Sequence, residues 1–153
     1  MDFKLNEEQL ELQELTHQFA ANEIRPVAAE YDEKNEFPLE VMKKAAEIGF
    51  LSSGIPQEYG GTGFSTMDNV IVCEELAWGC AGMYTSIMAN TLATTPILLF
   101  GTDEQKKEFL TPLTKEVSFA CFGLTEREAG SDNSAIKTTA IKKVFIVKET
   151  IFK

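Results

Sequence analysis

Hydrophobic side chains recur every three or four positions along most of residues 5–116, and this is the period of an α-helix with one buried face. Pro38 suits the first position of a helix, and Gly49 suits the position just beyond a helix end. The apolar stripe between them consists of Val41, Met42, Ala45 and Ile48. The pattern predicts a helix here that packs this stripe into a core.

Three further helix starts are marked by capping residues. Asn6, Ser65 and Thr102 each carry a side-chain oxygen that can accept a hydrogen bond from the first helical turn. Each is followed three positions later by an acidic or amide residue whose side chain can reach back to the capping residue. We expect a helix to begin directly after each of these positions.

Prolines and glycines predict where the helices stop. Pro26 should break or kink the first helical segment, and Pro112 should end or kink the last one. The largely apolar residues 81–100 predict a central helix that is interrupted near Pro96. Residues 54–63 contain a proline and four glycines, so they should form a loop.

The hydrophobic pattern changes after residue 116. Residues 117–122 are typical of a strand that leads into a turn, and the apolar runs at 144–147 and 150–152 are also strand-like. Two or three strands cannot cover both of their faces, so this β part is unfinished. The expected fold class is therefore mainly α, with a helical domain over residues 1–116 followed by the first strands of an incomplete β domain over residues 117–153.

Charge and composition narrow the classes of partner. The 153 residues carry a formal net charge of −10 and no cluster of Lys and Arg, so a nucleic-acid partner is not expected. The most basic stretch, residues 137–153, is better explained as a solvated face or tail. No apolar run approaches the ~20 residues of a membrane span, and the acidic N-terminus is unlike a signal or transit peptide. We expect a globular cytoplasmic protein that binds neither nucleic acid nor membrane.

Residue types alone supply no catalytic set. His17 is the only histidine and the three cysteines include no C-x-x-C pair, so neither a metal site nor a nucleophile with its base is predicted. Glu74 and Glu75 are adjacent on a predicted helix, so their side chains diverge by about 100 degrees and cannot form an acid/base pair facing one site. We interpret both as solvated or structural.

Five short sequence landmarks occur in order along residues 5–140. They are Ala45-Ala46-Glu47-Ile48-Gly49, Gly54-Ile55-Pro56 up to Gly61, Glu74-Glu75-Leu76-Ala77, Phe100-Gly101-Thr102-Asp103-Glu104-Gln105-Lys106, and Leu124-Thr125-Glu126 up to Asp132. In order and spacing they resemble the acyl-CoA dehydrogenase family, especially its bacterial short-chain, butyryl-type members. Any one landmark would be weak, but the five in register identify the chain as a member of this family.

The resemblance implies FAD as the cofactor and an acyl-CoA as the substrate. The flavin-contacting residues would be Phe122, Gly123, Leu124, Thr125, Glu126, Arg127, Glu128, Ala129, Gly130 and Ser131. Ser131 would also lie near the acyl-CoA. The acyl chain would run along the central helix past Tyr84, Met88 and Leu92, where the bulk of Tyr84 and Met88 would favour a short chain. From the residues alone, 122–131 is also typical of a polar turn that follows a strand.

In the family, a glutamate takes the α proton, the β hydride passes to the flavin, and the trans-2-enoyl-CoA is released. The electrons then go to electron-transfer flavoprotein. That glutamate, and most homo-oligomer contacts, belong to a C-terminal domain that follows the middle β domain. This chain resembles only the first domain and the opening of the second, so we expect a truncated fragment that is inactive alone.

One departure falls inside the flavin-contacting run, because Arg127 stands where the family has proline. The exchange frees a backbone φ that proline would fix and places a cation beside the turn. Two alternative functions stay open. One is a non-enzymatic helical module that binds an acyl-CoA or a dehydrogenase subunit, and the other is an acyl-CoA oxidase-like relative that reacts with oxygen.

Overall fold

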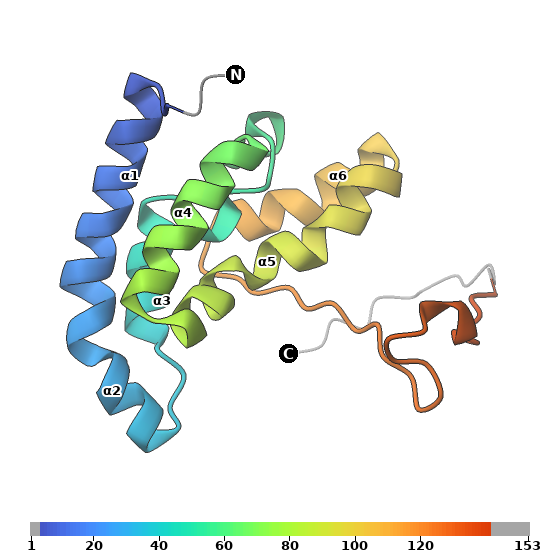
Figure 1. Cartoon of the computed structure of the whole chain (residues 1–153). Helices are drawn as coiled ribbons and strands as arrows, with labels where there is room; N and C mark the ends of the chain where they lie inside the picture. The colour runs from blue at the N-terminus through green and yellow to red at the C-terminus, as the bar shows by residue number, and fades with distance from the viewer. Residues whose placement is uncertain (1–3, 142–153) are drawn as a thin grey trace. The chain divides into compact units, whose positions relative to one another are not determined.

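The computed structural model describes residues 4–141 and divides the chain into two compact units, Met1–Phe122 and Gly123–Lys153. The first unit is all-helical (Figure 1). The described part of the second consists of turns and one 3₁₀ turn, η5 (Asn133–Ala135). A domain boundary near residue 117 stays a prediction, and the strand-like runs at 144–147 and 150–152 lie outside the described residues.

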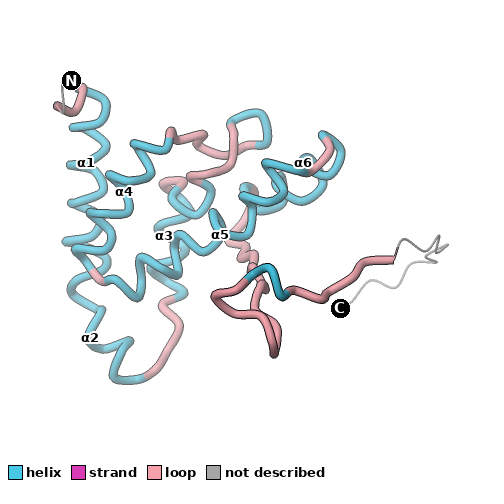
Figure 2. The backbone as a smooth tube through the Cα atoms, turned by 45° about the vertical axis from the view of Figure 1, so that its right-hand side comes forward, coloured by secondary structure: helices cyan, strands magenta, loops and turns pink. Residues whose placement is uncertain are grey.

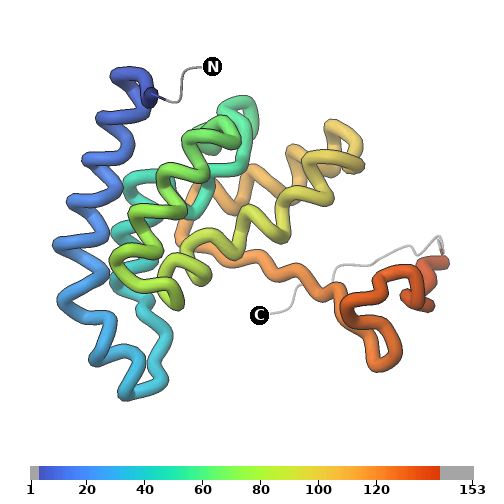
Figure 3. Tube along the Cα trace, viewed as in Figure 1, coloured from blue at the N-terminus to red at the C-terminus, as the bar shows by residue number. Residues whose placement is uncertain are grey.

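The first unit is built from helices around one core. In chain order they are α1 (Glu7–Phe19), η1 (Ala20–Ile24), α2 (Arg25–Lys34), α3 (Leu39–Glu47), η2 (Phe50–Ser52), η3 (Gln57–Tyr59), α4 (Thr66–Gly79), α5 (Ala81–Phe100), α6 (Asp103–Leu110) and η4 (Thr111–Thr114). Helix α4 packs against α1 on one side and α5 on the other, while η2 packs against both α3 and α5 (Figures 1 and 3). Over residues 4–141 no helix is long and apolar enough to cross a membrane.

The predicted helix starts are confirmed in detail. Asn6, Ser65 and Thr102 all accept a hydrogen bond from the backbone three residues on, and all three complete a reciprocal capping box. Pro38 lies one residue before α3, as the capping residue. Gly49 follows the end of α3 with φ +85°, a left-handed conformation that glycine adopts without strain.

The break predicted at Pro26 takes the form of a π-helical turn. In η1 the Arg25 amide donates to the Ala20 carbonyl five residues back, which inserts one extra residue into the turn. Pro26 then occupies the first turn of α2, where its missing N–H is not needed. Figure 1 shows α2 leaving α1 at an angle at this point.

The interruption predicted near Pro96 is wrong, because α5 runs from Ala81 to Phe100 with Pro96 inside it. The proline removes one donor, which would have paired with the carbonyl of Leu92. Leu92 is 61% exposed, so water can take the place of that donor. One missing bond near the exposed end of a 20-residue helix therefore does not end it.

The strand predicted over residues 117–122 is also absent. Among the described residues there is no strand, only an isolated bridge between Glu126 and Ala129, and Figure 2 shows the chain between η4 and η5 as loop. A strand needs a neighbouring strand to pair with its backbone groups. In this unit a side chain, that of Asn90 on α5, makes hydrogen bonds with Ser118 and Ala120 instead.

Helix α4 lies close against η1 at Gly79, the last residue of α4. A Cβ atom placed on Gly79 would lie 3.0 Å from the Ala20 Cβ and 3.1 Å from the Ile24 Cγ2, both in the π-helical turn η1. Ala20 and Ile24 are fully buried, so neither can move aside freely. The absence of a side chain at Gly79 is what lets α4 pack against η1.

Replacing Gly79 with alanine should therefore destabilise the protein by about 1–3 kcal/mol, even though alanine favours helix more than glycine does. The measurement is urea unfolding followed by circular dichroism. Gly82→Ala is the matched control, because its added Cβ meets only the Cys80 sulfur at 3.9 Å. Equal free energies of unfolding for the two variants would show that the α4–η1 contact is not close-packed.

Candidate functional site

The three residues expected to line an acyl-chain pocket form one row on α5. Tyr84, Met88 and Leu92 are spaced four apart, so the row drifts by about 40 degrees around the helix at each step. Tyr84 and Met88 are half-buried against the core, whereas Leu92 is exposed. The row thus runs from the edge of the core to the surface.

The two inner members of this row are held by neighbouring elements. The Cys73 thiol on α4 acts as a hydrogen-bond partner of the Tyr84 hydroxyl and raises the pKa of that hydroxyl. The Met88 sulfur lies 4.0 Å from the hydroxyl of Ser53, a buried residue just after η2. Both side chains therefore have a polar neighbour on another element of the first unit.

The residues expected to contact flavin form a tight turn. Phe122 ends the first unit, and the remainder, up to Ser131, belongs to the second. Within the turn the Glu126 amide donates to the Ala129 carbonyl at 2.9 Å, and the Ala129 amide donates back at 3.3 Å. Of residues 122–131, only Glu126 and Ala129 are not exposed. This leaves most of the turn available to a ligand.

Two glycines keep the backbone of this turn accessible. A Cβ placed on Gly123 or Gly130 would meet nothing within 4 Å. Backbone amides and carbonyls at such open positions can make hydrogen bonds to a ligand that approaches closely. The described residues therefore suit binding through the main chain, which is the mode that the sequence resemblance implies for this run.

Sequence reasoning gave Glu126 a place in the turn but missed what its carboxylate does. The carboxylate accepts hydrogen bonds from the backbone amides of Lys137 and Thr138, at 2.9 and 2.8 Å, and from the Thr138 hydroxyl. These bonds, the one from Lys137 foremost, hold the pKa of Glu126 below its ordinary value of 4.5. Ionised Glu126 thus ties residues 137–138 back to the turn.

Acid should break the hydrogen bonds that the Glu126 carboxylate accepts from Lys137 and Thr138. Because the folded-state pKa of Glu126 is lowered, its contribution is present above the ordinary value of 4.5 and is lost as the pH falls through the lowered pKa. Amide exchange at Lys137 and Thr138, measured by NMR from about pH 6 to about pH 3, should show the loss. In the Glu126→Gln variant, Lys137 and Thr138 should lack the protection from exchange that ionised Glu126 gives, at every pH in this range. Glu128→Gln, which removes only a partner of the Lys137 ammonium, should leave this protection in place.

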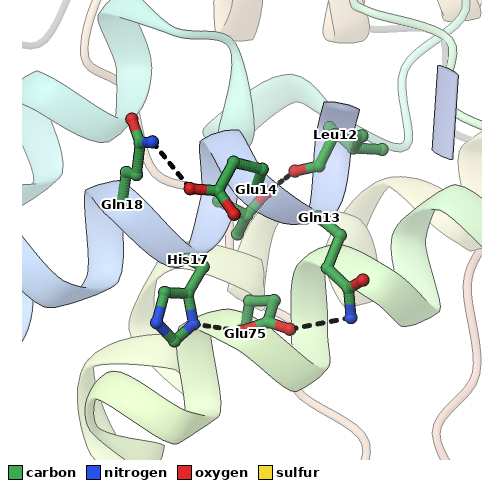
Figure 4. A network of polar contacts seen from close by, with 7 residues as sticks. Leu12, Gln13, Glu14, His17, Gln18 and Glu75 are labelled. Atoms are coloured by element: carbon green, nitrogen blue, oxygen red, sulfur yellow. Dashed lines mark hydrogen bonds and ion pairs between the residues drawn. The ribbon is translucent and has the colours of Figure 1, made fainter. Parts of the chain in front are cut away.

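The sole histidine, His17, belongs to a packing network between α1 and α4. Figure 4 shows the Glu75 carboxylate between two residues of α1, with the Gln13 amide donating at 3.0 Å and the His17 Nδ1 at 2.7 Å. The His17 ring also packs at a tilt against the Trp78 ring, with 4.2 Å between ring centroids, and the Arg25 guanidinium lies 4.3 Å from the centroid of the Trp78 ring. Glu75 therefore joins α1 to α4, which supports its structural interpretation. Within the described range no cluster of metal-ligating side chains occurs.

Comparison with known proteins shows which family this helical unit resembles. Residues 6–116 match the family described as "Acyl-CoA dehydrogenase, N-terminal domain". The chain is 45% identical over 141 residues to the acryloyl-CoA reductase (NADH) of Anaerotignum propionicum, covering 92% of this chain and 36% of that protein. It is 38% identical over 143 residues to a probable medium-chain specific acyl-CoA dehydrogenase of Caenorhabditis briggsae, covering 94% and 35%.

Solved structures agree with the sequence relatives. Butyryl-CoA dehydrogenase from Megasphaera elsdenii matches 88% of this chain and 36% of its own, at 33% identity and a TM-score of 0.77. An acyl-CoA dehydrogenase from Bacillus anthracis in complex with FAD matches 88% of this chain and 23% of its own, at 32% identity and a TM-score of 0.77. The chain thus spans about a third of the length of the curated relatives that it matches.

Proposed function

This chain belongs to the acyl-CoA dehydrogenase family, and on that premise we propose that it helps to form a site where FAD oxidises the Cα–Cβ bond of a short-chain acyl-CoA. The observation that carries the proposal is the match over 88% of the chain to a butyryl-CoA dehydrogenase fold. Bound FAD would supply the hydride acceptor. The chain's own residues would bind the cofactor and the substrate, orient them and shield them from water.

The 122–131 turn is the part we assign to FAD. Its exposed main chain and the Thr125 hydroxyl offer donors and acceptors to the flavin, and the open positions at Gly123 and Gly130 let a planar group approach. Fixed main-chain dipoles stabilise charge that develops in a reaction because they need no reorganisation. Arg127, at the exposed tip of the turn, adds a positive charge that the family's proline would lack.

We assign the acyl chain to the row on α5. Tyr84 and Met88 are half-buried against the core, so they would form the inner end of a pocket, and exposed Leu92 would form an apolar flank. A large side chain that cannot move aside limits the length of the ligand. Ser131 of the turn would lie near the thioester.

The full reaction needs more than this chain spans. The base that takes the α proton belongs, by family resemblance, to a C-terminal domain that the match does not include. Electron-transfer flavoprotein as electron acceptor, assembly with further copies of the enzyme and a cytoplasmic location are further parts of the proposal. The 153-residue chain on its own is proposed to be inactive.

A chimera tests the proposal directly. Residues 1–140 of this chain would replace the aligned part of the M. elsdenii butyryl-CoA dehydrogenase, and the parent enzyme would serve as the control. We expect the chimera to bind FAD stoichiometrically and to oxidise butyryl-CoA. A chimera that folds, by circular dichroism and gel filtration, but retains no flavin would refute the enzymatic assignment. It would favour a helical binding module instead.

Shortening Met88 should lengthen the preferred substrate. In the chimera, Met88→Gly removes the side chain that rests on Ser53, so acyl chains longer than butyryl should gain kcat/KM by about tenfold relative to butyryl-CoA. Leu99→Gly, on the same helix but 68% exposed and outside the proposed row, controls for the effect of glycine on α5. An unchanged chain-length profile would remove Met88 from the pocket.

A further inference from the structure

We propose that Asn90 is a positioning residue that fixes residues 118–120, the segment that leads into the 122–131 turn, against α5. This inference rests on the proposed function, because it gives a role in cofactor binding to a residue outside the turn. Asn90 is 1% exposed and lies on the core side of α5, two residues after Met88. Nothing in the resemblance pointed to it, and its importance emerges only from its contacts.

All three hydrogen bonds of the Asn90 carboxamide go to backbone groups. Its Nδ2 donates to the Ser118 carbonyl at 2.9 Å and to the Leu51 carbonyl at 3.2 Å. Its Oδ1 accepts from the Ala120 amide at 2.8 Å. A buried amide that is this fully paired fixes the relative position of the groups it joins, because any displacement leaves a polar group unpaired.

The pair of bonds to residues 118 and 120 reproduces the pairing of a β-strand neighbour. In a parallel ladder one residue of the neighbouring strand donates its N–H to the carbonyl of residue i−1 and accepts, at its own carbonyl, from the amide of residue i+1. The Asn90 carboxamide does this around Phe119, so both flanking backbone groups are paired without a second strand. Phe119 itself packs edge-on against Phe37 at 5.3 Å.

The same stretch of α5 is where other segments of the first unit meet. Met88 contacts Ser53, and Asn90 bonds to Leu51 of η2. A Cβ placed on Gly54 would lie 3.0 Å from the Thr91 side chain, so the loop after η2 also packs here. Asn90 thereby connects the helix that carries the proposed acyl pocket to the segment that leads into the proposed flavin contacts.

Amide exchange in the 153-residue chain tests, without any flavin, whether Asn90 holds residues 118–120. We call these hydrogen bonds of Asn90 to Ser118 and Ala120 the clamp. In Asn90→Leu, exchange of the Ala120 amide should accelerate about tenfold more than exchange of the Val72 amide in the core of α4, which reports global opening. Asn90→Ala removes the same three bonds with a smaller side chain and serves if the leucine variant fails to fold. Thr94→Val is the matched control: Thr94 lies one turn further on α5, is equally buried, and bonds only within its helix.

The chimera then tests the role in cofactor binding. Asn90→Leu should weaken its affinity for FAD about tenfold, whereas Thr94→Val should leave it unchanged. Equal acceleration at Ala120 and Val72 would overturn the clamp. A selective effect at Ala120 with unaltered FAD affinity would overturn the cofactor role. A parent chimera without flavin would refute the proposed function itself, and the exchange result would then stand only for the structure of the first unit.

Discussion

Residues 1–153, purified alone, should leave butyryl-CoA unoxidised under conditions in which the chimera turns over. The expected difference is at least about 10⁴-fold, because a missing general base and a missing preorganised site each remove factors of 10² or more. An unactivated α C–H bond does not ionise unless a base stands beside it and donors stabilise the enolate. The 122–131 turn can supply donors, but neither the turn nor the α5 row is proposed to supply the base.

Two carboxylates among the described residues illustrate why no base is at hand. Glu75 on α4 is engaged by His17 and Gln13 of α1, so its oxygens are already used in helix packing. Glu126 is engaged by the amides of Lys137 and Thr138, and its lowered pKa makes it a weak base. A proton acceptor tied up in this way cannot take part in an elimination without breaking the local structure.

Dye reduction with butyryl-CoA and the visible flavin spectrum are the two measurements for this first prediction. The chimera is the positive control, and the chimera with its M. elsdenii-derived catalytic glutamate changed to glutamine is the negative one. Turnover by the 153-residue chain with stoichiometric flavin would contradict both the assigned role of the turn and the expected position of the base.

The helix starts were predictable because their determinants are local. The caps at Asn6, Ser65 and Thr102 each form within three residues of the helix start, so the pattern contains the whole interaction. The continuation of α5 through Pro96 was not predictable in the same way, since it depends on solvent exposure at Leu92. The loss of the strand at 117–122 depends on Asn90, about thirty residues earlier in the chain.

The candidate site shows the same difference between local features, which the sequence predicts, and contacts between distant positions, which it does not. Sequence landmarks nominate Tyr84, Met88 and the 122–131 turn because residue types and order are enough for a resemblance. They do not reveal that Ser53 supports Met88, or that Glu126 reaches residues 137–138. Those contacts join positions 11 to 35 residues apart, so no local window contains both partners.

Gly61→Ala should be the most damaging single substitution that we predict for stability. A Cβ on Gly61 would lie 2.0 Å from the Ile55 carbonyl oxygen and 2.6 Å from the Ile55 Cβ. The Ile55 side chain is 1% exposed, and its carbonyl already accepts from the Gly63 amide at 2.9 Å. Relief would require the loop backbone to move, so we expect a loss of about 3 kcal/mol or more in the free energy of unfolding.

The same clash gives a physical reason for the glycine that ends the sequence landmark Gly54-Ile55-Pro56 up to Gly61. The glycine at position 61 is needed because the loop folds back over Ile55, and the adjacent Gly60, at φ +94°, brings the turn against Thr114 of η4. Urea unfolding followed by circular dichroism measures the effect. Gly54→Ala provides a graded comparison, since its Cβ would meet only the Thr91 side chain, at 3.0 Å, and that side chain can rotate. If Gly61→Ala is no worse than Gly54→Ala, the loop is not closed over Ile55, and the glycine landmark must then owe its presence to ligand contact instead of packing.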